Sequence, residues 1–133
     1  MRLALPPIDH AARVRTITEP FSPRPGNAVL FTDLTDIRWL TGFGGSNGWV
    51  VVRSGEVILG TDGRYGDRAR AETAASGATV IAEQQRARLH ERLIESLAGA
   101  ERVGLDPRTT TQADWARLAV DLPLQPLDSP VKT

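Results

Sequence analysis

A glycine-rich run, Thr41–Gly48 (TGFGGSNG), contains the pattern that most invites a chemical interpretation. Its last five residues match G-x-S-x-G, the pattern of a serine nucleophile on a sharp turn, and Asp62 and His90 could complete a catalytic triad. Such a turn needs a strand before the serine and a helix after it, but the residues from Trp49 onward are typical of a strand. The pattern therefore argues against a serine hydrolase built on Ser46.

The same run also fails the glycine patterns that bind phosphate. No Gly-Lys-Ser/Thr follows it, as a P-loop requires, and Asn47 stands where the last glycine of G-x-G-x-x-G belongs. The two histidines, His10 and His90, lie in different expected helices and form no H-x-H or H-E-x-x-H arrangement. We expect no metal ligand and no catalytic residue in this chain, and we expect the glycines to allow positive φ angles and close backbone approach.

A second polar motif, Asp62–Tyr65 (DGRY), follows an expected strand, where exposed functional residues often collect. Asp62 is also a good N-cap for a helix that begins near Arg64, and Tyr65 can pack beneath that helix. We favour capping as the role of Asp62, because helix amides that lack a partner are costly.

Composition limits the classes of function. The chain has 16 basic and 16 acidic residues and no basic patch interleaved with aromatic residues, which argues against nucleic-acid binding. It has no cysteine for disulfides or thiolate chemistry, and no stretch approaches the roughly 20 apolar residues that span a bilayer. We expect one domain, residues 1–133, in a cytoplasmic protein without membrane contact.

Helices and strands are expected to alternate along the chain. Apolar and β-branched runs predict strands at Ala28–Phe31, Trp49–Val52, Val57–Thr61, Thr79–Ile81, Arg102–Asp106 and near Leu124. The second and third of these form an antiparallel hairpin. Helices are predicted over Ile8–Glu19, stopped by Pro20, over Arg64–Ser76 and Gln85–Ala98, each followed by a glycine, and after a Thr111 cap. This order predicts a mixed β-sheet with helices packed on it.

Four segments together resemble the N-terminal domain of creatinases, prolidases and aminopeptidase P. In the order and spacing of that family, they are Thr35–Phe43, Gly45–Gly48, Thr61–Tyr65 and Arg102–Pro107. The resemblance covers nearly the whole chain. It implies an α/β fold in which a mixed six-stranded β-sheet is flanked by helices in a ribonuclease-H-like arrangement.

The resemblance also implies a division of labour. In these enzymes the domain precedes a pita-bread catalytic domain that holds two divalent metals (manganese, cobalt or zinc) and cleaves Xaa-Pro peptides. This chain stops about where the linker to that domain would begin, so we expect the catalytic domain to be absent and the chain alone to be inactive. The implied role is oligomerisation, as a dimer, and the shaping of access for proline-containing peptides.

The resemblance implies five candidate residues for substrate access. By position, Asp36 and Arg38 resemble residues that approach the substrate channel, and Ser46, Asn47 and Arg64 are the next candidates. An alternative role is a free-standing interaction module that has the same fold and no peptidase activity. The motifs do not distinguish dipeptidase, aminopeptidase and creatinase substrates.

Overall fold

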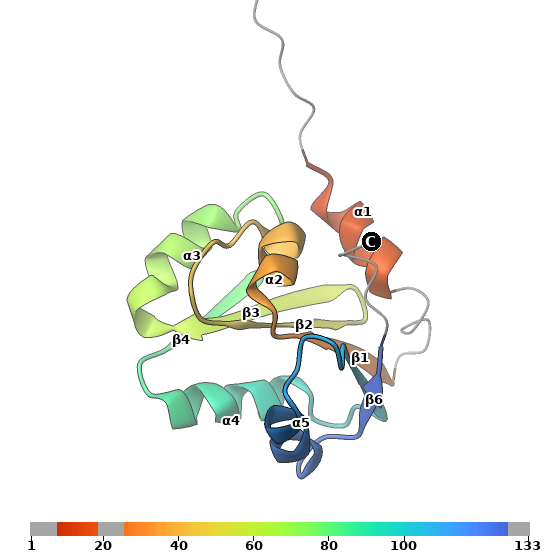
Figure 1. The fold of residues 1–133 in the computed structure, drawn as a ribbon. Coiled ribbons are helices and arrows are strands. Elements are labelled where there is room, and N and C mark those ends of the chain that lie inside the picture. The colour runs from red at the N-terminus through yellow and green to blue at the C-terminus, as the bar shows by residue number, and fades with distance from the viewer. Residues whose placement is uncertain (1–7, 19–25, 128–133) are drawn as a thin grey trace, which may run out of the picture.

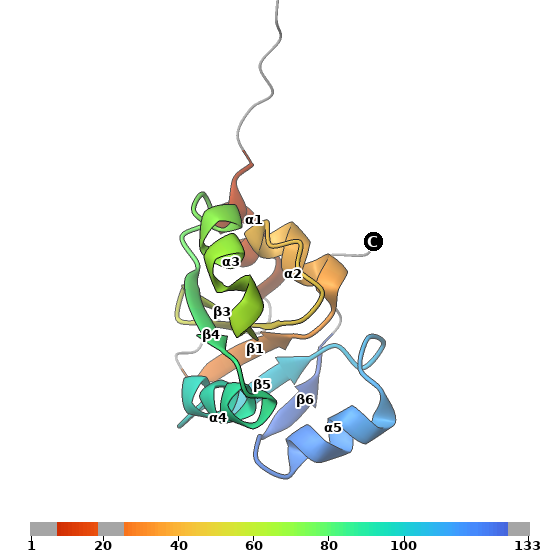
Figure 2. The ribbon, with the colours of Figure 1, turned by 90° about the vertical axis from the view of Figure 1, so that its left-hand side faces the viewer.

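The computed structural model describes residues 8–18 and 26–127 as a six-stranded sheet with helices on both faces (Figures 1 and 2). The strands are β1 (Asn27–Phe31), β2 (Trp49–Arg53), β3 (Glu56–Asp62), β4 (Thr79–Glu83), β5 (Arg102–Leu105) and β6 (Leu124–Pro126). The helices are α1 (His10–Thr18), α2 (Leu34–Thr41), the 3-10 helix η1 (Gly63–Tyr65), α3 (Gly66–Glu72), α4 (Arg86–Ser96) and α5 (Gln112–Ala119).

The sheet is mixed, with the strand order β4-β3-β2-β1-β5-β6. Strands β1, β2 and β3 are antiparallel neighbours, whereas β4 runs parallel to β3, and β5 and β6 continue parallel to β1. The predicted hairpin is confirmed, with Val50 opposite Leu59 in the β2–β3 pair. The mixed six-stranded, ribonuclease-H-like sheet flanked by helices is confirmed as well.

The two central strands are buried on both faces, as the continuous apolar run at 28–31 predicts. In β1, Val29 and Phe31 pack in the core beneath α1, α2 and α3, whereas Ala28 and Leu30 pack in the core of α4 and α5. Figure 1 shows these two groups of helices above and below the sheet. Side chains alternate between faces along a strand, so one run of apolar residues supplies both cores.

The leucine stripe of α4 packs as its spacing predicts. Leu89, Leu93 and Leu97 are at most 7% exposed and lie in the lower core of Figure 1. After the helix, Gly99 adopts a φ of 75°, and the guanidinium of Arg53 donates to the carbonyl of Ala98 (2.7 Å). The predicted glycine stop is therefore confirmed, and a side chain from β2 adds to it.

The first helix agrees with its predicted position in the described residues. It begins at His10, after Asp9 accepts a hydrogen bond from the amide of Ala12 (2.9 Å), and it is described as far as Thr18. The predicted last residue, Glu19, and the predicted stop, Pro20, lie outside the described residues.

The helix predicted over 64–76 is shorter than expected. Its first turn is the separate 3-10 helix η1, and α3 ends at Glu72. The hydroxyl of Thr73 donates to the carbonyl of Ala69 (2.7 Å), and the chain then turns toward Gly77, which has a φ of 72°. Threonine competes with the helix amides for carbonyl groups in this way, which explains the early end of an alanine-rich segment.

Candidate functional site

Helix α2, which the sequence analysis does not predict, positions two of the candidate residues. The carboxylate of Asp33 accepts a hydrogen bond from the amide of Asp36 (3.2 Å), which starts the helix. Gly42 ends it with a φ of 87°, and its amide donates to the carbonyl of Arg38 (2.8 Å). Asp36 is 1% exposed, whereas Arg38 is exposed, so Arg38 is the member of this pair that can meet a molecule from solution.

Arg38 lies in a hollow of about 530 Å³ between α1 and α2. Two contacts hold these helices together: Nδ1 of His10 donates to the carbonyl of Leu40 (3.0 Å), and Arg13 donates to that of Trp39 (2.7 Å). The guanidinium of Arg13 also stacks over the ring of Trp39, 4.6 Å from its centroid. In the described part of the chain, the Arg38 side chain makes no hydrogen bond or ion pair.

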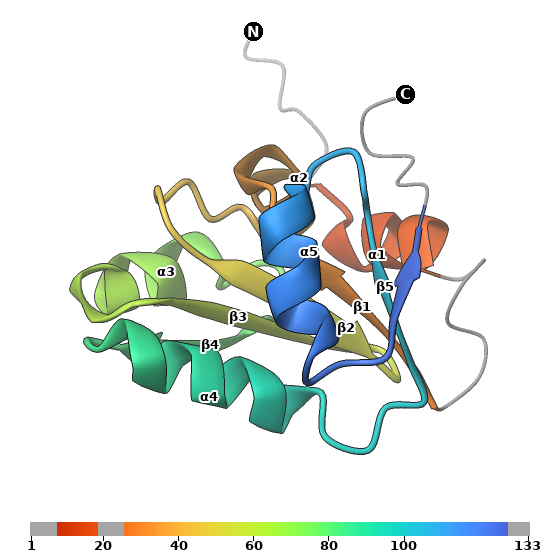
Figure 3. The same ribbon diagram turned by 60° about the horizontal axis from the view of Figure 1, so that its bottom comes forward.

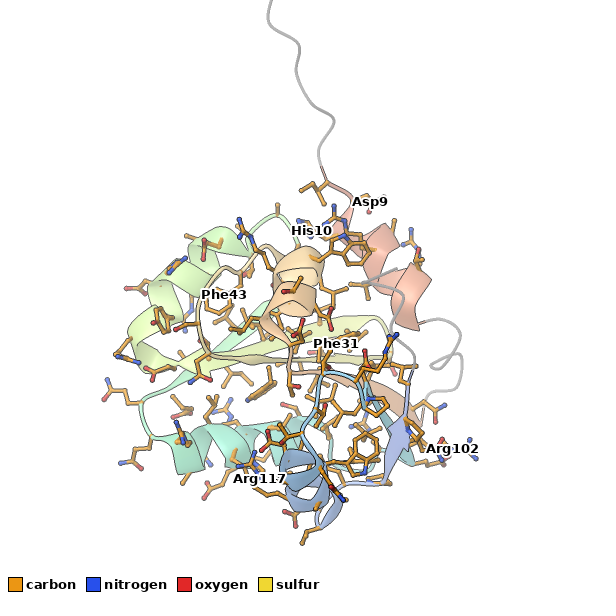
Figure 4. The ribbon with its side chains drawn as sticks, in the orientation of Figure 1. Asp9, His10, Phe31, Phe43, Arg102 and Arg117 are labelled. Atoms are coloured by element: carbon orange, nitrogen blue, oxygen red, sulfur yellow. The ribbon has the colours of Figure 1, made fainter. Side chains whose placement is uncertain are left out.

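The glycine-rich run after α2 is anchored by a buried phenylalanine. The Thr41 hydroxyl donates to the carbonyl of Ile37 (2.7 Å) and accepts from the amide of Phe43 (3.2 Å). Phe43 is 1% exposed and meets the ring of Tyr65 edge-on, with 6.4 Å between ring centroids. Figure 4 shows Phe43 inside the layer between the sheet and α2 and α3. The loop therefore has a fixed start.

The glycines of this loop are required by close contacts. A Cβ on Gly45 would overlap the ring of Phe43, and one on Gly48 would lie 2.9 Å from the carbonyl oxygen of Gly60 on β3. Both expectations for the glycines are confirmed, since Gly42 has a positive φ and Gly48 approaches another backbone. Small size, and not phosphate binding, explains the pattern.

Ser46 is not placed as a catalytic nucleophile. The loop runs from a helix into strand β2, which is the reverse of the strand-to-helix turn that a nucleophile needs. The hydroxyl of Ser46 lies 3.0 Å from the hydroxyl of Tyr65, with which it forms a hydrogen bond. The argument against a serine hydrolase is thus supported by the surroundings of this side chain.

The motif at 62–65 forms a capped turn. The carboxylate of Asp62 accepts from the amide of Arg64 (2.9 Å) and pairs with its guanidinium (3.2 Å), so the predicted capping role is confirmed. The pKa of Asp62 is lowered mainly by the hydrogen bond from the backbone amide of Arg64 and then by the bond from its side chain. The side-chain hydrogen bond to Asp62 in turn raises the pKa of Arg64. The guanidinium also lies over the Tyr65 ring, 5.6 Å from its centroid.

The five candidates fall into two groups. Ser46 and Arg64 meet around Tyr65, and the carbonyl of Asn47 accepts a hydrogen bond from the Thr61 hydroxyl (2.7 Å). Asn47 and Arg64 both line a cleft of about 930 Å³. The second group, Asp36 and Arg38, belongs to α2, and Arg38 opens into the other hollow.

The sequence analysis missed the residues on the opposite wall of this cleft. Arg86 and His90 of α4 line it, together with Trp49. His90 lies in the helix in which the sequence analysis places it, and it is half-buried there. The signal was the spacing of four residues between Arg86 and His90, which places both on the helix face that borders the leucine stripe.

The described residues offer no metal centre. No group of three or more His, Asp or Glu side chains in that part of the chain is arranged to hold a metal ion. None of the helices in the described ranges is long and apolar enough to cross a membrane. No step of chemistry through a metal is therefore assigned to these residues.

The mixed sheet, its two helical layers and the glycine-rich loop define an α/β/α domain, and comparison with known families identifies its class. Residues 24–133 match the family model described as the Creatinase/Prolidase N-terminal domain. The chain belongs to this family. A comparison with curated protein sequences gives no match.

Solved structures with the same fold include parts of larger peptidases. The N-terminal domain of the cytoplasmic peptidase PepQ from Mycobacterium tuberculosis is 26% identical, with a TM-score of 0.68, 92% of this chain covered and 94% of that one. The Xaa-Pro dipeptidase from Bacillus anthracis is 16% identical, with a TM-score of 0.74 and coverages of 92% and 34%. The X-prolyl aminopeptidase from Caenorhabditis elegans, described as having a di-nuclear active site, is 28% identical, with a TM-score of 0.57 and coverages of 91% and 22%.

A first prediction concerns the fit of the glycine loop around Phe43. We expect Gly45→Ala to displace the Phe43 ring and lower the free energy of unfolding by about 1–3 kcal/mol, as other overpacked substitutions do. Gly44→Ala is the matched control, because its Cβ would come no closer than 3.4 Å to any atom outside the neighbouring residues. Urea denaturation measures both, and equal stability of the two variants would contradict the account of the loop.

A second prediction concerns the charge of Asp62. Because hydrogen bonds from Arg64 lower the pKa of Asp62, this carboxylate stabilises the fold above its ordinary pKa, and that contribution is lost as the pH falls through the lowered value. NMR titration of the carboxyl carbons should show Asp62 protonating below the ordinary pKa of an aspartate. In Arg64→Ala the pKa of Asp62 should rise, and an unchanged value would contradict the role of the arginine.

Proposed function

We propose that this chain is the non-catalytic N-terminal domain of an Xaa-Pro dipeptidase or aminopeptidase. Its role is to contribute to oligomerisation and to shape the access of proline-containing peptides to a metal site in a following catalytic domain. Family membership and the peptidase relatives support this role. The proposal places the full enzyme in the cytoplasm, because its relative PepQ is a cytoplasmic peptidase.

Coverage of the relatives supports a catalytic partner domain. The chain spans about a third of the Bacillus anthracis dipeptidase (34%) and less of the Caenorhabditis elegans aminopeptidase (22%). In our proposal the remaining part corresponds to the catalytic domain and holds two divalent metals, manganese, cobalt or zinc. The described residues of this chain include no cluster of three or more potential metal ligands, so in this proposal they contribute to the walls of the site.

The observation that carries the substrate-access role is the exposed guanidinium of Arg38, which has no ion pair or hydrogen bond among the described residues. An arginine held on a capped helix offers a fixed fork of donors that matches a carboxylate. Arg13 borders the same hollow and adds positive charge to it, while the lining carboxylate of Glu72 is paired with Arg68 (3.0 Å). Asp36 acts in this proposal through α2, because its side chain is buried.

Ser46, Asn47 and Arg64 form the second part of the proposed access wall. They lie at the end of the sheet where the glycine-rich loop meets η1. The side chains of Ser46 and Asn47 are uncharged, whereas the guanidinium of Arg64 is ion-paired. Because Arg64 is already paired with Asp62, we assign it less of the substrate binding than Arg38. Assembly as a dimer is proposed on the family relationship.

A third prediction tests Arg38 in the full-length enzyme. We expect Arg38→Ala to reduce kcat/KM for an Xaa-Pro peptide by roughly tenfold, the effect of losing one charged hydrogen bond. The free energy of unfolding should change by less than about 0.5 kcal/mol, because the side chain is exposed. The control is Arg15→Ala, which removes an exposed arginine of α1 and should leave the kinetics unchanged. Unchanged kinetics of Arg38→Ala would remove Arg38 from the access wall.

A fourth prediction concerns residues 1–133 alone. We expect no release of proline from Xaa-Pro dipeptides when manganese is added, because the described residues lack a cluster of metal ligands. Chromatographic detection of free proline measures this, with a complete Xaa-Pro dipeptidase as the positive control. Metal-dependent turnover by the pure chain would contradict the proposed division of labour.

A further inference from the structure

A cleft of about 930 Å³ opens between α4 and α5, which cover the same face of the sheet (Figures 2 and 3). Its apolar lining comes from Trp49 at the start of β2 and from Leu89, Leu93 and Leu118 of the two helices. Sites for small molecules have this size and combine an apolar lining with a few polar groups. The cleft therefore has the dimensions of a binding site.

Trp49 contributes a hydrogen-bond donor whose acceptor is missing. Its side chain is 6% exposed, and Nε1 is enclosed and has no hydrogen-bond partner among the described residues. The indole ring is held in place against β3, since a Cβ on Gly60 would overlap it. A buried indole N–H normally has a partner, so the hydrogen-bonding capacity of this one is unused, and the part of Trp49 that lines the cleft serves as an apolar surface.

Two further donors of the cleft are unengaged. Arg86 and His90 lie one turn apart on α4, and in the described ranges their side chains make no hydrogen bond or ion pair. The other two arginines of the lining are different, because Arg64 and Arg117 each pair with an aspartate (3.2 and 3.0 Å). In the described lining, the basic side chains without an ion pair thus both lie on α4.

The carboxylates of the lining do not cancel these donors. Asp62, Glu83 and Asp114 are each engaged in ion pairs with arginines, and Glu83 pairs with two arginines at 3.3 and 3.9 Å. Among the basic side chains of the described lining, the guanidinium of Arg86 and the imidazole of His90 are the two without an ion pair. These groups suit a ligand that brings acceptor oxygens and negative charge.

We propose that the cleft binds a small organic carboxylate with an apolar body. The carboxylate meets Arg86 and His90, and the apolar body contacts the ring of Trp49 and the leucines. This inference goes beyond the proposed peptidase function, because the site belongs to residues 1–133 and needs no catalytic domain.

The test uses the 133-residue chain and N-acetyl-leucine, which has a carboxylate and a branched apolar side chain. Two-dimensional NMR should show a saturable shift of the Trp49 indole N–H. N-acetyl-leucinamide, which lacks the charge, and acetate, which lacks the apolar body, should each bind at least about tenfold more weakly. Inorganic phosphate should be equally weak. Absence of a saturable shift, or equal binding of the amide, acetate or phosphate, would overturn the proposal.

Variants separate this site from the rest of the surface. Arg86→Ala should weaken N-acetyl-leucine binding by about tenfold, and the exposed position of Arg86 makes it a mild substitution for the fold. Arg15→Ala and Arg38→Ala, on the other face of the sheet, should bind like the parent chain. Equal binding of Arg86→Ala would overturn the site, whereas a kinetic defect of Arg38→Ala in the full enzyme bears on the peptidase role alone.

Discussion

Burial of both faces of β1 and β2 is the constraint on which the rest of this domain depends. Residues 28–31 of β1 and 50–52 of β2 are all at most 3% exposed, so each face of these strands needs its own covering layer. A layer of helices on each side meets that need, and each layer forms a separate core on its own face. The connecting loops then lie at the ends of the strands. One end of the sheet is formed by the end of β1, the start of β2 and the end of β3. All five candidate residues follow or precede these points in the chain.

At that end of the sheet, the conformation of the loop before β2 depends more on aromatic packing than on polar contacts. Phe43 fills the space over Gly45 and meets Tyr65, while Gly48 lies against the backbone of β3. From outside, Arg68 of α3 donates to the carbonyl of Gly44 (3.3 Å). Contacts on several sides hold the loop in one conformation. The glycine pattern, which could have indicated catalysis, is therefore explained by close packing.

The sequence predicted those parts of the fold whose signals are local. Continuous apolar runs gave the central strands, and the leucine spacing gave α4, because burial determines residue type directly at such positions. Helix α2 escaped notice because it is only eight residues long and its start and end depend on Asp33 and Gly42. The cleft could not be predicted at all, since it depends on the distance between two helices far apart in sequence. Nor could the sequence show that Arg64 is paired whereas Arg38 has no ion pair among the described residues.

The glycine-rich loop at this end of the sheet also determines whether the two hollows can influence each other. Gly42 lines the hollow between α1 and α2 on one face, and Asn47 lines the cleft between α4 and α5 on the other. The loop between them is thus a shared wall. Phe43 is buried, Thr61 holds the carbonyl of Asn47, and Gly42 is fixed by its bond to α2, so the wall has little freedom to move. A fixed wall favours two sites that bind independently, because coupling between sites requires an element with two accessible arrangements.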